Sequence, residues 1–316
     1  MRAGAGIARS LCVLAVAALA GCAAQAPRAT APAAHSSPCG TVPTFAAGAE
    51  RATLWVRTSA EYRAASESTY RAARTALELG LADPAWTAEP TQTGGLAALP
   101  PAVVMDIDET VLDNSAPQAG LLIDETCFPE FASVWDDWVA QRSAPAVPGA
   151  AEFIRAARES KDPQGRPVRV FFITNRECEL RAGNKSDCPQ EEDTLANLRM
   201  LGLDSPTLAD DLMIKGEQPD WGSEKLSRRL EVARRYRVVL NVGDDLADFL
   251  PEVRRASPRL RDEARCRADA LWGRRWFVLP NPMYGSWEAS LYDFRNDLGG
   301  EDVSRRKFDQ LRQERP

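Results

Sequence analysis

The stretch Ala102-Val-Val-Met-Asp-Ile-Asp-Glu-Thr110 decides the fold prediction. Its first four residues are apolar and predict a short buried strand, which runs directly into an acidic pair. Similar apolar runs occur at 168–173, 212–214, 238–242 and 276–279, and helical patterns lie between them at about 148–161, 190–201 and 223–235. Strands that alternate with helices predict an α/β protein whose doubly wound parallel sheet is covered on both faces.

Polar side chains follow each of the first four predicted strands. After the first come Asp106 and Asp108; after the others come Thr174-Asn175-Arg176, then Lys215, then Asp244-Asp245 with Asp248. Ligands of such sheets bind at the carboxyl ends of the strands, so we expect these groups to converge. The structural alternatives are an N-cap for the acidic pair and an exposed charged turn at 244–245.

The polar residues expected to converge at the strand ends have the composition of a site that binds a phosphate and a cation. Asp106 can attack phosphorus as a nucleophile, and Asp108 can protonate the leaving oxygen and then deprotonate the hydrolytic water. We expect Asp106, Asp108 and Asp244 to hold a hard cation, for which Mg²⁺ is the natural choice. Thr174 can bind a phosphoryl oxygen, and Lys215 can neutralise charge in the transition state.

Four further residues are expected to support this inner group: Asn175, Arg176, Asp245 and Asp248. The two aspartates could hold Lys215 or metal-bound waters.

Composition excludes several other chemistries. The 316-residue chain contains one histidine, His35, in a stretch rich in Ala, Pro and Ser. That excludes Ser-His-Asp hydrolysis, Cys-His proteolysis and histidine-rich zinc sites. The formal net charge of −6 argues against broad nucleic-acid binding. There is no Gly-Lys dipeptide, so a Walker loop is excluded as well.

The first residues read as a targeting signal. Arg2 and Arg9 precede an apolar run at 11–20, which is too short to span a bilayer stably. Leu19-Ala20-Gly21-Cys22 resembles a bacterial lipobox, which implies removal of 1–21 and lipidation of Cys22. The alternative is an ordinary signal cleaved nearby. We expect 22–44 to be a flexible tether, and the protein to be an outer-membrane lipoprotein, periplasmic or surface-exposed.

Cysteine chemistry is compatible with that location. Beyond Cys12 and Cys22, five cysteines remain: Cys39, Cys127, Cys178, Cys188 and Cys266. Cys178 and Cys188 flank a short polar stretch and make the best local disulfide. Because five is odd, at least one thiol stays free or pairs outside the chain.

Several longer motifs resemble the haloacid dehalogenase-like (HAD) superfamily and, within it, the bacterial class C acid phosphatases, which are lipid-anchored 5′-nucleotidases. They are Asp106-Ile-Asp-Glu-Thr-Val-Leu-Asp-Asn-Ser115, Trp135-Asp-Asp-Trp138, Val147-Pro-Gly-Ala-Ala-Glu-Phe153, Phe171-Phe-Ile-Thr-Asn-Arg176, Gly243-Asp-Asp-Leu-Ala-Asp-Phe249 and Pro280-Asn-Pro-Met-Tyr-Gly-Ser-Trp287. The resemblance implies a HAD-like Rossmannoid domain over 45–300, with a small helical cap segment at about 116–145. Residues 301–316 would form a tail, expected as a short solvated helix.

The same resemblance assigns roles to residues. It implies Asp106 as nucleophile and metal ligand, and Asp108 as acid/base with its backbone carbonyl on the metal. It also implies that Trp135 and Tyr284 clamp a nucleobase, whereas Trp138 and Trp287 are expected to pack in the core. Where the family often places Pro-Tyr, this chain has Ala116-Pro117-Gln118, and the segments 162–167 and 178–188 look inserted.

The sequence therefore predicts a Mg²⁺-dependent acid phosphatase that hydrolyses phosphomonoesters through an aspartyl-phosphate, and we expect nucleoside 5′-monophosphates as its substrates. Two alternatives remain: a broad-specificity phosphatase for non-nucleotide substrates, and a catalytically silent surface-binding lipoprotein. The expected partners are a small phosphomonoester and the membrane that holds the lipid anchor, but no nucleic-acid polymer. The preferred base and the oligomeric state stay open, with a dimer as one option.

Overall fold

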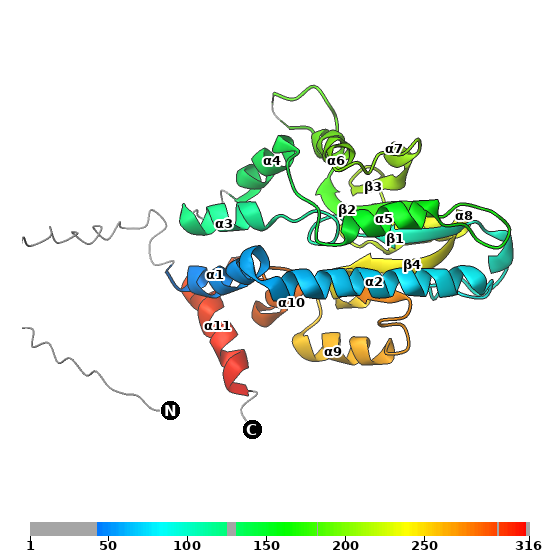
Figure 1. Cartoon of the computed structure of the whole chain (residues 1–316). Coiled ribbons are helices and arrows are strands. Elements are labelled where there is room, and N and C mark those ends of the chain that lie inside the picture. Colours follow the sequence, from blue (N-terminus) through cyan, green and yellow to red (C-terminus); the bar gives the residue numbers. More distant parts are fainter. Residues whose placement is uncertain (1–42, 125–130, 182, 296, 314–316) are drawn as a thin grey trace, which may run out of the picture. The chain divides into compact units, whose positions relative to one another are not determined.

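The computed structural model describes residues 43–124, 131–181, 183–295 and 297–313 (Figure 1). In this part of the chain, five parallel strands form one sheet in the order β3-β2-β1-β4-β5. The strands are β1 (Pro101–Met105), β2 (Arg169–Glu177), β3 (Leu212–Lys215), β4 (Arg237–Gly243) and β5 (Trp276–Val278). The predicted parallel α/β fold is confirmed, and β2 extends further than predicted, so that residues 174–176 belong to the strand itself.

Alternate residues of the central strands pack on opposite faces of the sheet, as the pleat requires. Val103 and Met105 of β1 lie in the core with α2 (Ala60–Ala82) and α5 (Ala150–Glu159). Ala102 and Val104 pack on the other face with residues of α8 (Leu226–Arg235). Figure 1 shows α2 and α5 running alongside the strands. The sheet is thus covered on both faces, which explains the continuous apolar runs in its strands.

The chain before β1 contains two long helices that follow each other directly. α1 (Pro43–Thr58) and α2 are separated at Ser59, whose Oγ accepts a hydrogen bond from the Tyr62 amide at 3.1 Å and caps α2. Tyr62 and Tyr70 of α2 are buried, so this helix packs one face against the core.

The segment that follows β1 contains α3 (Ser115–Ile123) and α4 (Phe131–Gln141), and the chain then enters α5. After β2 come α6 (Pro189–Met200) and α7 (Leu208–Asp211). The remaining helices are η1 (Leu96–Ala98), η3 (Leu246–Asp248), η4 (Pro251–Val253), α9 (Pro258–Arg267), α10 (Ser286–Ala289), η5 (Ser290–Tyr292) and α11 (Gly300–Gln313). α11 contacts α1 and buries Val303, so the tail helix is not merely solvated.

Two cysteine predictions can be compared with the structure. Cys178 and Cys188 form a disulfide between the end of β2 and the start of α6, and Cys266 is an exposed free thiol. Cys39 and Cys127 lie outside the described residues, as do the predicted signal, Cys22 and the tether up to residue 42. Among the described residues, no helix is both long enough and apolar enough to cross a membrane.

Candidate active site

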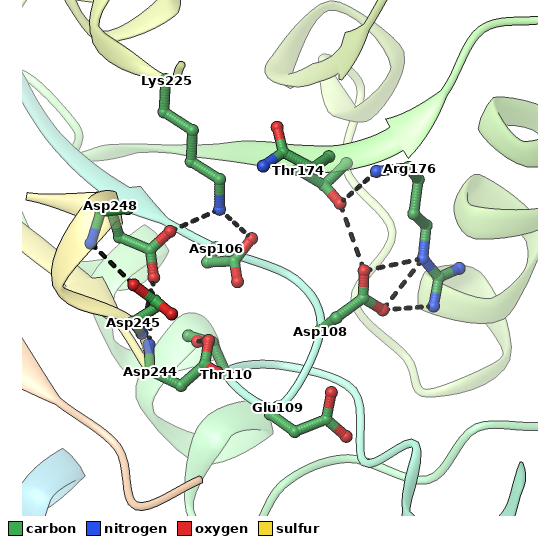
Figure 2. Close-up of polar contacts among 12 residues, drawn as sticks. Asp106, Asp108, Glu109, Thr110, Thr174, Arg176, Lys225, Asp244, Asp245 and Asp248 are labelled. Atoms are coloured by element: carbon green, nitrogen blue, oxygen red, sulfur yellow. Dashed lines mark hydrogen bonds and ion pairs between the residues drawn. The ribbon is translucent and has the colours of Figure 1, made fainter. Parts of the chain in front are cut away.

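Three carboxylates meet at the carboxyl ends of β1 and β4. Asp106 follows β1, Asp244 follows β4, and Asp248 ends η3; one oxygen of each lies within 4.8 Å of the others (Figure 2). Asp248 was expected only to support the site, but its carboxylate belongs to this group. The turn after β4 explains this, because Asp248 Oδ2 accepts hydrogen bonds from the amides of Asp244 (3.2 Å) and Asp245 (3.1 Å).

Gly243 makes that turn possible. A Cβ atom at this position would lie 2.3 Å from Asp248 Oδ2 and 2.7 Å from Asp248 Cβ. Asp244 is held by neutral donors, with Thr110 Oγ1 at 3.2 Å and Asn281 Nδ2 at 2.9 Å. The carboxylate group is therefore fixed by its surroundings before any ligand is considered.

Lys225 is the cation that contacts this group. Its Nζ donates to Asp106 Oδ1 and lies 2.7 Å from Asp248 Oδ1, and its side chain is 6% exposed (Figure 2). Lys215, the lysine predicted from the sequence, instead pairs with Glu177, and both side chains are about one-third exposed. This corrects the expected position of the charge-neutralising lysine. Lys225 directly precedes α8 and follows no strand, so the strand-end pattern could not indicate it.

Burial dominates the electrostatics of the group. It raises the pKa of Asp106 to about 7, against the lowering effect of Lys225 and with a further rise from Asp248. It also raises the pKa of Asp244 well above its usual range, with the charges of Asp106 and Asp248 adding to the effect. Burial would lower the pKa of Lys225, but the two neighbouring carboxylates outweigh burial and raise it.

Three carboxylates and one ammonium leave net negative charge in a buried place. The ligand set consists of oxygen atoms only, and a hard divalent cation of the Mg²⁺ type fits such a set. The residues present therefore match a divalent metal site formed by Asp106, Asp244 and Asp248.

Asp108 faces a different set of partners (Figure 2). Its Oδ1 accepts from Arg176 Nη2 at 2.8 Å and Nε at 3.1 Å, and from Asn114 Nδ2 at 3.0 Å. Thr174 Oγ1 lies 3.4 Å from Oδ2, so the structure brings Thr174 and Arg176 to Asp108. The chain turns after Asp108, where the amides of Val111 and Leu112 donate to the Ile107 carbonyl.

The two other supporting residues hold the frame of the site. Asn175 Oδ1 accepts from Arg228 Nη2 at 2.8 Å, on the α8 side of β2. Asp245 accepts from the amide of Ala247 at 2.9 Å and from that of Ser286 at 2.6 Å, and so ties the 280–287 loop to η3. Burial would raise the pKa of Asp245, but these hydrogen bonds and Arg261 outweigh it and lower that pKa.

The aromatic residues lie around the Asp108 side of the site. The Trp135 ring lies 5.7 Å from the Arg176 guanidinium, and the Tyr284 hydroxyl donates to Glu109. Tyr284 and Trp135 are both partly buried. Trp287, expected in the core, is 39% exposed, and its Nε1 donates to the Tyr284 carbonyl at 3.2 Å.

Sequence reasoning missed two residues here, Glu109 and Asn114. Glu109 is buried, has a φ of 57°, and receives hydrogen bonds from the Asn114 amide (2.8 Å) and Nδ2 (3.2 Å). Asn114 Oδ1 in turn accepts a hydrogen bond from Trp138 Nε1 at 2.8 Å. Trp138 therefore packs against the core, as expected, and also orients a polar side chain. The only signal was their place in the motif that begins at Asp106.

A parallel sheet with a buried acidic group at the ends of its first and fourth strands defines a HAD-type phosphohydrolase. The chain belongs to the HAD superfamily, subfamily IIIB (acid phosphatase), whose family model matches residues 30–287. The structure is similar to that of the class C acid phosphatase from Bacillus anthracis, with a TM-score of 0.68 and 27% identity over 84% of this chain and 97% of that chain. A structure of that enzyme with tungstate bound is similar as well, with a TM-score of 0.68 and 26% identity.

These findings establish the general activity. The protein is an acid phosphatase, a hydrolase of phosphoric monoesters, and its substrate is a small phosphoester. Phosphatases of this superfamily use a divalent metal, and the buried aspartates of this chain could bind one.

Proposed function

We propose that this acid phosphatase is Mg²⁺-dependent and hydrolyses nucleoside 5′-monophosphates through an aspartyl-phosphate on Asp106. One observation carries the proposal: Asp106 lies in a buried group with Asp244 and Asp248, and in direct contact with the ammonium of Lys225. A carboxylate in this position can approach a phosphate whose negative charge is offset by the Lys225 ammonium and by a metal ion held by the aspartates. The tungstate bound to the B. anthracis enzyme supports an oxyanion site in this fold, since tungstate is tetrahedral like phosphate.

The chemistry follows from the residues present. An oxygen of Asp106 attacks phosphorus, the bond from phosphorus to the leaving oxygen breaks, and that oxygen takes a proton from the Asp108 carboxyl group. Asp108 then takes a proton from water as that water attacks the phosphorus and releases Asp106. Lys225 and Thr174 stabilise the charge that develops on the phosphoryl oxygens.

Mg²⁺, when bound by Asp106, Asp244 and Asp248, would offset the repulsion between the carboxylates and the incoming phosphate.

The preference for nucleotides is supported by the aromatic side chains on the Asp108 side, Trp135 and Tyr284. A flat ring can stack on any base and contributes roughly 1–3 kcal/mol per base. A panel of mononucleotides, glycerol phosphate and an aryl phosphate tests this preference. Equal kcat/KM for mononucleotides and glycerol phosphate would favour a broad-specificity phosphatase.

The nucleophile is tested with Asp106→Asn and a matched control, Asp269→Asn, whose side chain is 84% exposed just after α9. We expect the first variant to lose mononucleotide hydrolysis and the second to retain it. After acid quenching with a radiolabelled phosphoester, the label should stay on wild-type protein and be absent from Asp106→Asn. Undiminished turnover by Asp106→Asn would contradict the proposal.

We also propose that residues 1–21 are removed and that a lipidated Cys22 anchors the enzyme in the outer membrane. The lipobox-like sequence and the cysteine at its end support this. Incorporation of labelled palmitate that persists in Cys22→Ser would contradict it.

A further inference from the structure

Two tryptophans of α4 contact the groups that hold Asp108. The Trp135 ring lies 5.7 Å from the guanidinium of Arg176, and Arg176 donates two hydrogen bonds to Asp108 Oδ1. Trp138 Nε1 donates to Asn114 Oδ1 at 2.8 Å, and Asn114 Nδ2 donates to Asp108 at 3.0 Å. Positions three residues apart lie on one face of a helix, so a single face of α4 reaches Asp108 by two routes.

We propose that α4 positions Asp108 for proton transfer, with Arg176 and Asn114 as the positioning residues and with Trp135 and Trp138 setting their orientation. This proposal rests on the proposed role of Asp108 as acid and base.

Each route is built from buried, directional contacts. The Arg176 side chain is 1% exposed, and its Nη1 also donates to Thr194 Oγ1 at 2.9 Å, so the guanidinium has no free rotation. Asn114 is fully buried. Its carboxamide donates through nitrogen and accepts through oxygen, so the Trp138 indole at Oδ1 favours the orientation in which Nδ2 faces Asp108. Loss of that indole N–H would leave the amide oxygen without its donor, and Nδ2 would then be shared among Asp108, Glu109 and the Leu112 carbonyl.

α4 itself is anchored, which makes it a suitable support. Asp136, between the two tryptophans, forms an ion pair with Arg181 at 2.8 Å and accepts from Gln190 Nε2 at 2.6 Å. Directly after the end of α4, Arg142 pairs with Asp193 of α6 at 2.7 Å. These contacts tie α4 to α6 and to the disulfide-closed loop that follows β2, so the tryptophans hold their places relative to the sheet.

The test uses leaving groups that differ in their need for a proton. An alkoxide departs only with general acid help, whereas 4-nitrophenolate, a far weaker base, needs little. kcat/KM covers binding and the first chemical step, in which the leaving group departs. For Trp138→Phe, which removes the N–H and keeps a ring, we expect kcat/KM to fall about tenfold on a mononucleotide and less than about twofold on 4-nitrophenyl phosphate. Arg176→Lys should show the same selectivity with a larger loss.

The matched control is Trp272→Phe, which removes an indole N–H that donates to the Arg265 carbonyl at 3.0 Å. It should leave the ratio of the two kcat/KM values unchanged. If Trp138→Phe lowers both values equally, or neither, α4 does not position Asp108 and the proposal is wrong. Because Trp138→Phe is a conservative change, the test remains decisive even if Arg176→Lys does not fold.

Asp108→Asn separates this proposal from the one on which it rests. If Asp108→Asn shows no leaving-group selectivity, the acid role of Asp108 fails, and this inference fails with it. If Asp108→Asn is selective but Trp138→Phe is not, only the positioning role fails. In the Asp108→Asn background, adding Trp138→Phe should cause no further selective loss, since both changes act on one proton transfer. Additive losses would overturn the inference.

Discussion

Lys225→Met is the change that tests the electrostatics of the site most directly. The substitution keeps the length of the side chain and removes the ammonium that lies between Asp106 and Asp248. Removal of one partner from a buried ion pair costs about 3–5 kcal/mol, because the other charges stay buried without compensation. For a domain of this size we expect the melting temperature of the metal-free protein to fall by roughly 5–9 °C. Loss of a cation beside the transferring group should lower kcat by about a hundredfold or more.

The effect of this substitution on stability should depend on pH. Burial raises the pKa of Asp106 to about 7, and removal of Lys225 takes away an interaction that lowers this pKa. Below the pKa the carboxyl group takes up a proton, and less negative charge is left without compensation. The loss of stability in Lys225→Met should therefore be larger near pH 8 than near pH 5, as melting curves of both proteins at the two values would show.

Lys215→Met is the matched control, since Lys215 and its partner Glu177 are partly exposed. Such a pair is worth about 0–1 kcal/mol, so the melting temperature should change by less than about 2 °C and kcat by less than about twofold. The reasoning is refuted if Lys215→Met loses activity while Lys225→Met keeps both its activity and its melting temperature.

Three further outcomes are expected from other parts of the structure. The double variant Cys178→Ser/Cys188→Ser should lose up to about 3 kcal/mol of unfolding free energy because its short loop is no longer closed, and a wild-type melting curve that reductant leaves unchanged would contradict this. Burial would raise the pKa of Asp162, but hydrogen bonds from the Arg166 amide and side chain outweigh it and lower the pKa. The stability that Asp162 contributes is therefore present above its unfolded pKa of about 3.9 and is lost as the pH falls through the lower folded value, so Asp162→Asn should differ from wild type at pH 6 and converge with it in strong acid. Mg²⁺ should raise the melting temperature of chelator-treated wild type and restore its activity, with a much smaller rise in Asp244→Asn; equal rises would place the metal elsewhere.

The sequence was sufficient for the parts of the site that follow strands directly. Asp106, Thr174 and Asp244 come at the ends of apolar runs, and the topology of a parallel sheet brings such ends to one edge. Lys225 could not be located in this way, because the polar segment before α8 has no periodicity that fixes where it returns to the sheet. Lys215 met the strand-end criterion, yet the structure turns it toward Glu177.

The hydrogen bond from Trp138 could not be predicted from the sequence for a different reason. An indole ring satisfies apolar patterning whether or not its N–H has a particular acceptor, so the sequence predicted core packing and could not predict the hydrogen bond to Asn114. Asp248 illustrates a third limit. Its place in the motif was clear, but whether it faces the metal site or merely caps a turn depends on the close approach that Gly243 permits.

Asp106 and Asp108 lie in different surroundings, which suits the different roles proposed for these two carboxylates. They are two residues apart, yet Asp106 faces Lys225 and two other carboxylates, whereas Asp108 faces Arg176 and neutral donors. The chain turns directly after Asp108, at Glu109, whose φ of 57° costs of order 1 kcal/mol or more and whose side chain is held by Tyr284 and by Asn114. The strained residue thus directly follows Asp108, and one of the side chains that hold it, Asn114, also donates a hydrogen bond to Asp108.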